Sequence, residues 1–200
     1  MMTSFPYHII LASNSPRRKE LLSGLGLDFE VKVLPDIEEN YPDSLPVGDI
    51  AEFIAREKAE PYRHLIGERD MVITADTVVV VADEVLGKPV DEADAVRMLH
   101  MISGRIHQVI TGVCLTTCKR QRTFSVRTDV TFKELTDDEI NYYIRQYHPM
   151  DKAGAYGIQE WIGYVGVMSL CGSYFNVMGL PVQRIWSELQ QWPDADRSFL

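Results

Sequence analysis

Hydrophobic and polar positions follow one another along this chain in a pattern that predicts a succession of strands and helices. Alternating or continuous apolar runs predict strands at residues 8–10, 29–34, 71–81, 85–86, 106–116 and 123–132. Apolar residues at helical spacing predict helices that begin near residues 16, 47, 92, 137 and 182. A glycine-containing loop at residues 149–159 is expected to enter a further strand.

The strand predicted at residues 71–81 contains an ionisable side chain at its centre. Apart from Thr74, Asp76 and Thr77 the run is apolar, which is typical of a strand covered on both faces. Taking a carboxylate out of water costs several kcal/mol unless it is paired, hydrogen-bonded or metal-bound. Two interpretations of Asp76 follow. It belongs to a functional site, which we favour because buried ionisable groups cluster at such sites, or it caps a local break in the strand.

A predicted hairpin adds a lysine to these candidates. Residues 83–84 form a turn, residues 85–86 return as a strand, and Lys88 follows where the chain bends. Lys88 is close enough to Asp76 in sequence for a hairpin to bring both side chains to one cleft. His107, in the next strand, is a candidate general base or, more commonly for such a residue, a hydrogen-bonded structural side chain.

The first predicted helix begins with residues that suit an anion. Ser15 is a good N-cap and Pro16 fits the first helical position. The positive end of the helix dipole then lies near the guanidinium groups of Arg17 and Arg18, a combination suited to a phosphate or a carboxylate. The same residues are also compatible with a capped surface helix that carries two solvated arginines.

Two further stretches each allow two interpretations. Asp36, Glu38 and Glu39 follow a predicted strand, where they either hold a divalent cation, which prefers hard oxygen ligands, or form a solvated turn. Gln159 ends the glycine-containing loop, and its carboxamide complements the O4 and N3–H groups of uracil or thymine. The alternative is that Gln159 is a surface residue.

Composition excludes several classes of protein. A hydrophobic content of 46% and a charged content of 24% are ordinary for a soluble protein, and 200 residues can bury a proper core. The net charge of -9 argues against a protein that coats nucleic acid. Three cysteines without C-x-x-C spacing predict neither a disulfide framework nor a zinc cluster and favour the cytoplasm. Without a secretion signal or a long apolar run, the protein is expected to be neither secreted nor membrane-spanning.

Five motifs occur in order along the chain: Ser15-Pro16-Arg17-Arg18, Ala75-Asp76-Thr77, Gly87-Lys88-Pro89, His107-Gln108-Val109 with Thr111, and Asp151-Lys152-Ala153-Gly154-Ala155-Tyr156-Gly157-Ile158-Gln159. Together they resemble the Maf family of nucleotide pyrophosphatases. The resemblance runs from about Ile9 to Pro181. It implies a mixed α/β fold, with an elongated β-sheet flanked by helices and two lobes around a deep cleft, similar to the inosine triphosphate pyrophosphatase (Maf/Ham1-like) fold. Residues 1–192 are expected to form this single domain, and residues 193–200 a C-terminal tail.

The same resemblance implies a reaction and the residues that carry it. It implies a nucleoside triphosphate pyrophosphatase that hydrolyses dTTP and UTP, or modified pyrimidine nucleotides, to the monophosphate and pyrophosphate with Mg²⁺ or Mn²⁺, as house-cleaning of the nucleotide pool. Asp76 is implied as the proton acceptor and a metal ligand, and Glu39 as part of the metal or water network. Phosphate binding is implied for Arg18, Lys58 and Lys88. Specificity for dTTP and UTP over 7-methyl-GTP is implied for Arg17, Thr77 and Gln159.

A regulator that binds nucleotide without turnover is the competing class of function. Members of the family resemble proteins linked to septum formation and arrest of cell division. Binding alone, however, needs neither the acid at Asp76 nor the lysine at Lys88. The expected partner is a small nucleoside triphosphate in the cytoplasm, with no nucleic acid and no membrane. A homodimer is compatible with the sequence, which does not decide the oligomeric state.

Overall fold

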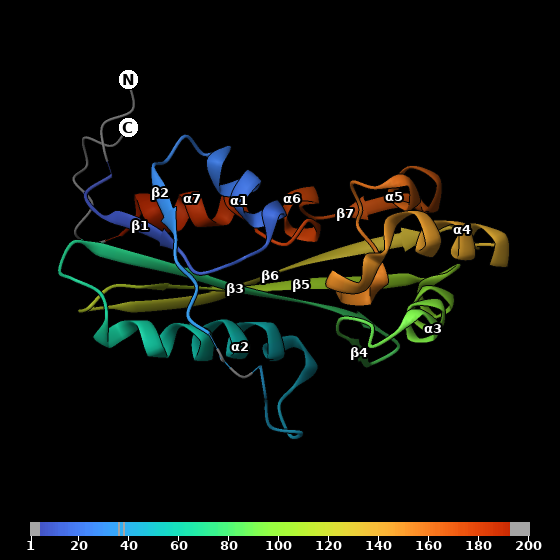
Figure 1. Ribbon diagram of the computed structural model, residues 1–200, viewed down its shortest axis with the longest axis horizontal. Helices are drawn as coiled ribbons and strands as arrows, with labels where there is room; N and C mark the ends of the chain where they lie inside the picture. The colour runs from blue at the N-terminus through green and yellow to red at the C-terminus, as the bar shows by residue number, and fades with distance from the viewer. Residues whose placement is uncertain (1–4, 36, 38, 193–200) are drawn as a thin grey trace. The chain divides into compact units, whose positions relative to one another are not determined.

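The computed structural model describes residues 5–35, 37 and 39–192, and these residues form two compact units (Figure 1). Unit 1 consists of Met1–Asp76, Thr111–Val126 and Gly179–Leu200, and unit 2 of Thr77–Ile110 and Arg127–Met178. The tail predicted at residues 193–200 lies outside the described residues. In the part of the chain that the structure describes, we find no helix that is both long and apolar enough to cross a membrane.

Within the described residues, seven strands form one mixed sheet in the order β2-β1-β3-β5-β6-β7, with β4 paired to β3. β1 pairs in parallel with β2 and β3, whereas the pairs β3–β4 and β6–β7 are antiparallel. The predicted mixed α/β class is therefore confirmed. The strands are β1 (His8–Leu11), β2 (Phe29–Val31), β3 (Asp70–Val81), β4 (Glu84–Leu86), β5 (Ile106–Thr116), β6 (Gln121–Phe132) and β7 (Val167–Cys171).

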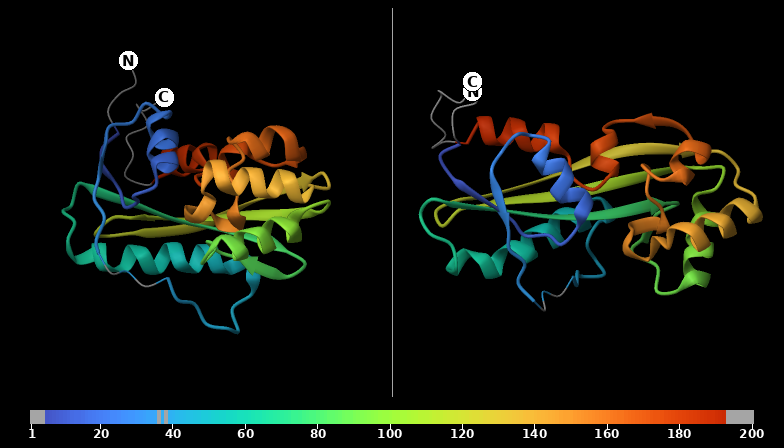
Figure 2. Two further views of the ribbon diagram at one scale, coloured as in Figure 1. Left: turned by 45° about the vertical axis from the view of Figure 1, so that its right-hand side comes forward. Right: turned by 45° about the horizontal axis from the view of Figure 1, so that its top comes forward.

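Helices cover both faces of the sheet in unit 1. α2 (Ile50–Ala59) lies along one face, and α1 (Pro16–Ser23) and α7 (Val182–Gln190) lie on the other (Figures 1 and 2). Short 3-10 helices at Val47–Asp49 and Glu60–His64 flank α2. The apolar face of α2 is buried, as its helical spacing predicts, and consists of Ile50, Ala51, Ile54, Ala55 and Ala59.

The start of α1 confirms the predicted cap, whereas the strand after it is shorter than predicted. The Ser15 hydroxyl accepts a hydrogen bond from the Arg18 amide at 3.4 Å. β2 ends at Val31 and not near residue 34, because only three residues pair with β1. Val31 and Val33 are 43% and 38% exposed, so the alternating valines do not form a buried face.

Unit 2 contains α3 (Glu92–Ile102), α4 (Asp137–Tyr147), α5 (Trp161–Gly166) and α6 (Tyr174–Val177), with 3-10 turns at Pro149–Asp151 and Ala153–Ala155. The expectation that the loop at residues 149–159 enters a strand is wrong. A turn and α5 follow the loop, and β7 begins only at Val167. Gly163 permits this arrangement, because a Cβ there would lie 1.8 Å from the Ile158 carbonyl oxygen.

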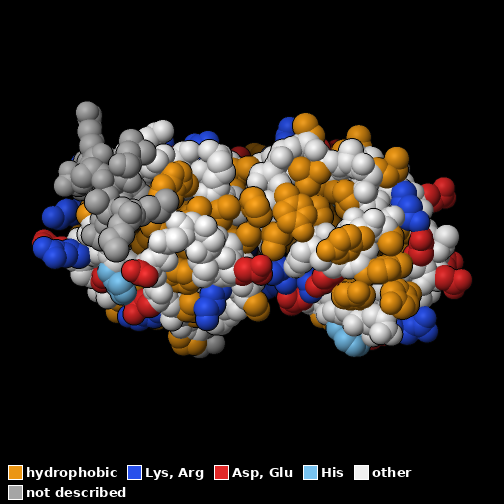
Figure 3. Space-filling model, turned by 90° about the horizontal axis from the view of Figure 1, so that it is seen from above, with side chains coloured by type: hydrophobic (Ala, Val, Ile, Leu, Met, Phe, Trp, Pro, Cys, Tyr) orange, Lys and Arg blue, Asp and Glu red, His pale blue; other side chains and the backbone are white. Residues whose placement is uncertain are grey.

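Large hydrophobic side chains are exposed on α4, α5, β7 and α6. Orange hydrophobic side chains are visible on the face shown in Figure 3. The exposed hydrophobic residues on these elements include Tyr142, Tyr164, Met168, Tyr174 and Phe175. None of them is a predicted site residue.

Candidate active site

Lys58 binds two carboxylates in unit 1. Its Nζ lies 2.8 Å from Oδ1 of Asp76 and 2.8 Å from Oε1 of Glu39. The Asp76 and Lys58 side chains are 12% and 15% exposed, whereas that of Glu39 is 47% exposed. β3 is continuous through Asp76, so this carboxylate does not cap a break in the strand. The cost of its burial is offset by an ion pair instead.

Close packing of α2 against the sheet allows Lys58 to reach Asp76. A Cβ at Gly112 on β5 would lie 2.2 Å from the main chain of α2, so only glycine allows this approach. The Thr74 hydroxyl on β3 donates to the Ala55 carbonyl oxygen at 2.6 Å. Thr74 and Asp76 are two residues apart on a strand and therefore share a face, while Lys58 follows Ala55 by about one helical turn. Neither contact was predicted from the sequence.

Arg18 fastens the segment before Asp76 to the C-terminal part of unit 1. Its Nε donates to the Gly179 carbonyl oxygen at 2.8 Å, and its Nη1 donates to the Ala75 carbonyl oxygen at 2.8 Å. A guanidinium group presents its donors in a fixed fork, so two carbonyl partners fix its orientation. Arg18 therefore helps to hold the main chain that precedes the buried carboxylate.

Several charges gather around this guanidinium group. Burial lowers the pKa of Arg18, Asp76 and Glu39 act in the opposite direction, and the neighbouring Arg17 lowers the pKa further. Together with Lys58, the cluster contains three cationic and two anionic side chains. A local cationic surplus in a protein with a net charge of -9 suits a polyanion such as a phosphate chain.

Glu39 and Asp76 provide the hard oxygen donors that a divalent cation prefers, although the point on which they converge is occupied by the Nζ of Lys58. Two other predicted candidates, Asp36 and Glu38, lie outside the described residues. Among residues 5–35, 37 and 39–192, no group of three or more His, Cys, Asp or Glu residues is arranged to hold a metal ion. Mg²⁺ is commonly held by one or two carboxylates together with waters and substrate phosphates. The two hard oxygen donors suit that mode of binding.

The remaining predicted site residues belong to unit 2. Thr77 follows Asp76 on β3, and Lys88 is exposed after the confirmed β3–β4 hairpin. Gln159 lies in a turn, where its Oε1 is buried and has no hydrogen-bond partner within the described part of the chain. That Lys88 and Asp76 share one cleft stays a prediction.

Three residues without an expected role, Tyr143, Lys152 and Glu160, interact at the turn that contains Gln159. Tyr143 donates its hydroxyl to the Glu160 carboxylate, and Lys152 Nζ lies 3.1 Å from Glu160 Oε1. Lys152 falls within the longest of the five motifs, which was the available signal. Tyr143 matched an ordinary core position of a helix, so nothing in the spacing marked it.

The structural interpretation of His107 is supported by its surroundings. Its Nε2 lies 2.7 Å from the Tyr156 hydroxyl, and the side chain packs against the rings of Phe132 and Tyr156. Burial lowers the pKa of His107 to about 4. The imidazole is therefore neutral near pH 7, and it fastens the segment that precedes Gln159 to β5.

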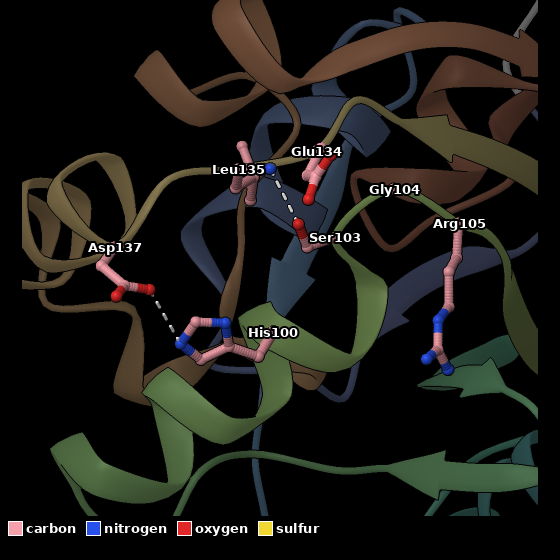
Figure 4. Close-up of a pocket in the computed structure, with 7 residues that line it drawn as sticks. All are labelled: His100, Ser103, Gly104, Arg105, Glu134, Leu135 and Asp137. Atoms are coloured by element: carbon pink, nitrogen blue, oxygen red, sulfur yellow. Dashed lines mark hydrogen bonds and ion pairs between the residues drawn. The ribbon is translucent and has the colours of Figure 1, made fainter.

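A surface pocket in unit 2 contains none of the predicted site residues (Figure 4). In this pocket the Leu135 amide donates to the Ser103 hydroxyl at 2.7 Å, and His100 lies 3.5 Å from Asp137. Both contacts connect the end of α3 to the start of α4. The lining residues are His100, Ser103, Gly104, Arg105, Glu134, Leu135 and Asp137.

Comparison with known proteins agrees with the motifs. The family model described as "Maf-like protein" matches residues 8–192, so this chain belongs to the Maf family. The chain is 63% identical to a protein of Phocaeicola vulgatus named "dTTP/UTP pyrophosphatase", over 92% of this chain and 96% of that protein. Proteins with the same name from Bacteroides fragilis and Porphyromonas gingivalis are 60% and 50% identical, over 92% and 95% of this chain and 96% of each relative.

A solved structure of a HAM1 protein from Coxiella burnetii matches with a TM-score of 0.48 and 13% sequence identity. The match covers 92% of this chain and 99% of that one.

Proposed function

We propose that this protein hydrolyses dTTP and UTP to the nucleoside monophosphate and pyrophosphate. The observation that carries the proposal is the buried ion pair of Asp76 with Lys58, shared with Glu39, in a chain whose relatives bear that name. Modified pyrimidine triphosphates belong to the same proposed substrate class. Such a reaction removes unwanted nucleotides from the cytoplasmic pool.

In this proposal Asp76 accepts a proton from the attacking water. The water oxygen forms a bond to the α-phosphorus, and the bond from that phosphorus to the α–β bridging oxygen breaks. Pyrophosphate takes the electron pair of the broken bond. Because Lys58 donates to Asp76, it keeps the carboxylate oriented in the free protein.

Cationic groups would hold the phosphate chain. We assign this role to Arg18, Lys58 and Lys88, because transfer at phosphorus depends on positioning and on neutralising negative charge. Glu39 and Asp76 would hold Mg²⁺ or Mn²⁺, and the bound cation would supply further neutralisation of the phosphate oxygens.

Three residues would select the base. The buried Oε1 of Gln159, without a partner in the described structure, supports a role as acceptor from the N3–H of a uracil or thymine ring. Its amide group would donate to O4. Arg17 and Thr77 are assigned to the same selection by the family resemblance.

Pyrophosphate release from a panel of standard and modified nucleoside triphosphates, with Mg²⁺ or Mn²⁺, tests the proposal. We expect release from dTTP and UTP, and loss of release in Asp76→Asn with the fold intact by circular dichroism. Asp83→Asn is the matched control, because this exposed turn residue has φ of 64°, which asparagine tolerates. Nucleotide binding without turnover in the wild type would contradict the proposal and favour the regulator.

A further inference from the structure

Gln159 occupies a central position of a tight turn. The Glu160 amide donates to the Gly157 carbonyl oxygen at 3.0 Å, which closes a four-residue turn with Ile158 and Gln159 at its centre. Ile158 is buried, and the next helix packs directly against its carbonyl oxygen at Gly163. The main chain on both sides of the Gln159 carboxamide is therefore constrained.

One buried hydroxyl connects the two ends of this turn. Tyr143 on α4 is fully buried, and its hydroxyl accepts from the Gly157 amide at 2.9 Å while it donates to the Glu160 carboxylate. The other oxygen of Glu160 lies 3.1 Å from Nζ of Lys152, which is itself 7% exposed and 2.8 Å from Asp151 Oδ1. Both corners of the turn are thus fixed by one group of three side chains.

A contribution to stability does not by itself explain this arrangement. A buried ion pair such as Lys152 with Glu160 is often no more stabilising than apolar packing of the same volume. The chain leading to the turn also contains consecutive left-handed residues, Gly154 at φ 68° and Ala155 at φ 57°, and the latter is unfavourable for a side chain. Polar networks and backbone strain of this kind are concentrated at sites where conformation matters for function.

The turn also leaves no room for a side chain at its first position. A Cβ at Gly157 would lie 2.9 Å from Cδ of Glu160 and 3.1 Å from Cε of Lys152. The network is therefore packed directly against the main chain of the turn. A shift of the Glu160 or Lys152 side chain would move the turn, and Gln159 with it.

We propose that Tyr143, Lys152 and Glu160 form a positioning network that fixes the Gln159 turn and thereby sets the discrimination between uracil and cytosine rings. Uracil presents an acceptor and an N–H donor to the carboxamide, whereas cytosine presents the reverse, so discrimination depends on the placement of the carboxamide. If the turn is less firmly held, the carboxamide can pair with either ring. This inference rests on the proposed function and goes beyond it by naming residues that do not contact the nucleotide.

The test compares Tyr143→Phe and Glu160→Gln with the wild type. We expect the ratio of kcat/KM for UTP over CTP to fall at least fivefold in each variant. The fall should come mainly from a higher KM for UTP, with kcat changed less than twofold. The network supports binding of the base, which contributes equally to the ground state and the transition state. Tyr147→Phe is the matched control. Tyr147 lies one turn further along α4, is more than a third exposed and stacks on Tyr143. Phenylalanine keeps the stacked ring and removes only the hydroxyl group, so the UTP to CTP ratio should stay unchanged.

A second measurement reports the network without turnover. The side-chain amide resonance of Gln159, assigned by its absence in Gln159→Leu, should shift or broaden in nucleotide-free Tyr143→Phe and Glu160→Gln but not in Tyr147→Phe. If the wild type releases no pyrophosphate from UTP, the proposed function fails and this resonance alone decides the network. An unchanged resonance and an unchanged UTP to CTP ratio in both variants would overturn the inference. If Tyr143→Phe does not fold, Glu160→Gln carries the test, because it keeps the shape of the side chain.

Discussion

Gly112 on β5 and Ala51 on α2 approach so closely that a Cβ at residue 112 would lie 2.2 Å from the carbonyl carbon and oxygen of residue 51. The spacing between the helix and the sheet is therefore determined by the absence of a side chain. This spacing also determines whether Lys58, further along α2, can reach Asp76.

Gly112→Ala should push α2 away from the sheet. We expect the free energy of unfolding to fall by about 1–3 kcal/mol, as in other overpacked cores, and pyrophosphate release to fall with it because Lys58 is displaced. Urea denaturation and the release assay measure the two effects. Gly48→Ala is the control, since a Cβ there meets no heavy atom within 4 Å. Wild-type stability in Gly112→Ala would show that α2 can move without cost.

Lys58→Met should leave Asp76 without its ion-pair partner. Removing one partner of a buried pair costs about 3–5 kcal/mol, and the partial exposure of both side chains makes this an upper range here. The double variant Lys58→Met with Asp76→Asn should recover part of the loss, because the uncompensated charge is gone. Urea denaturation of both single variants and the double variant measures the coupling. If the losses in the two single variants simply add up in the double variant, the contact between Lys58 and Asp76 contributes nothing to stability.

Glu39→Gln should weaken the response to metal more than the fold. The variant keeps its shape but loses the charge that we assign to a divalent cation. We expect the Mg²⁺ concentration for half-maximal pyrophosphate release to rise several-fold, with the unfolding midpoint nearly unchanged because Glu39 is about half exposed. Glu57→Gln, an exposed carboxylate on α2, is the control. An identical Mg²⁺ response in both variants would remove Glu39 from the proposed metal site.

His107 should make the protein less stable in mild acid. Its pKa is about 4 in the folded protein and about 6.5 when unfolded, so between these values the unfolded chain binds the additional proton. Stability contributed by the neutral imidazole is therefore complete above pH 6.5 and is lost as the pH falls towards 4, by about 3 kcal/mol at most.

The difference between wild type and His107→Gln isolates this effect, because other groups titrate in both proteins. We expect the free energy of unfolding to fall less steeply from pH 7 to pH 4.5 in the variant. His100→Gln, which removes an exposed imidazole, is the control. Equal slopes in wild type and His107→Gln would contradict the cause assigned to this pKa.

Local features of the fold were predictable from the sequence. The Ser15 cap, the continuous strand around Asp76 and the hairpin before Lys88 depend on neighbouring residues, and the structure confirms all three. Burial in an apolar strand also required Asp76 to have a partner. The family resemblance assigned Lys58 to phosphate binding, so its ion pair with Asp76 was not predicted. That contact depends on how α2 packs against β3 and β5.

Features determined by tertiary packing were missed. Val31 and Val33 occupy alternating positions, yet their surroundings leave them exposed, and the strand expected after Gln159 is the helix α5. Tyr143 has the spacing of a core residue and is buried like one. Its hydroxyl acquires two partners only when the chain from Gly157 to Glu160 is brought against α4.

The lysine between Glu39 and Asp76 acts as an internal counter-ion. Its ammonium group balances charges that would otherwise repel each other whenever no cation is supplied from solution. We therefore expect depletion of divalent ions to stop the proposed reaction while the fold stays intact. Activity is then expected to return when the ions are restored, without synthesis of new protein.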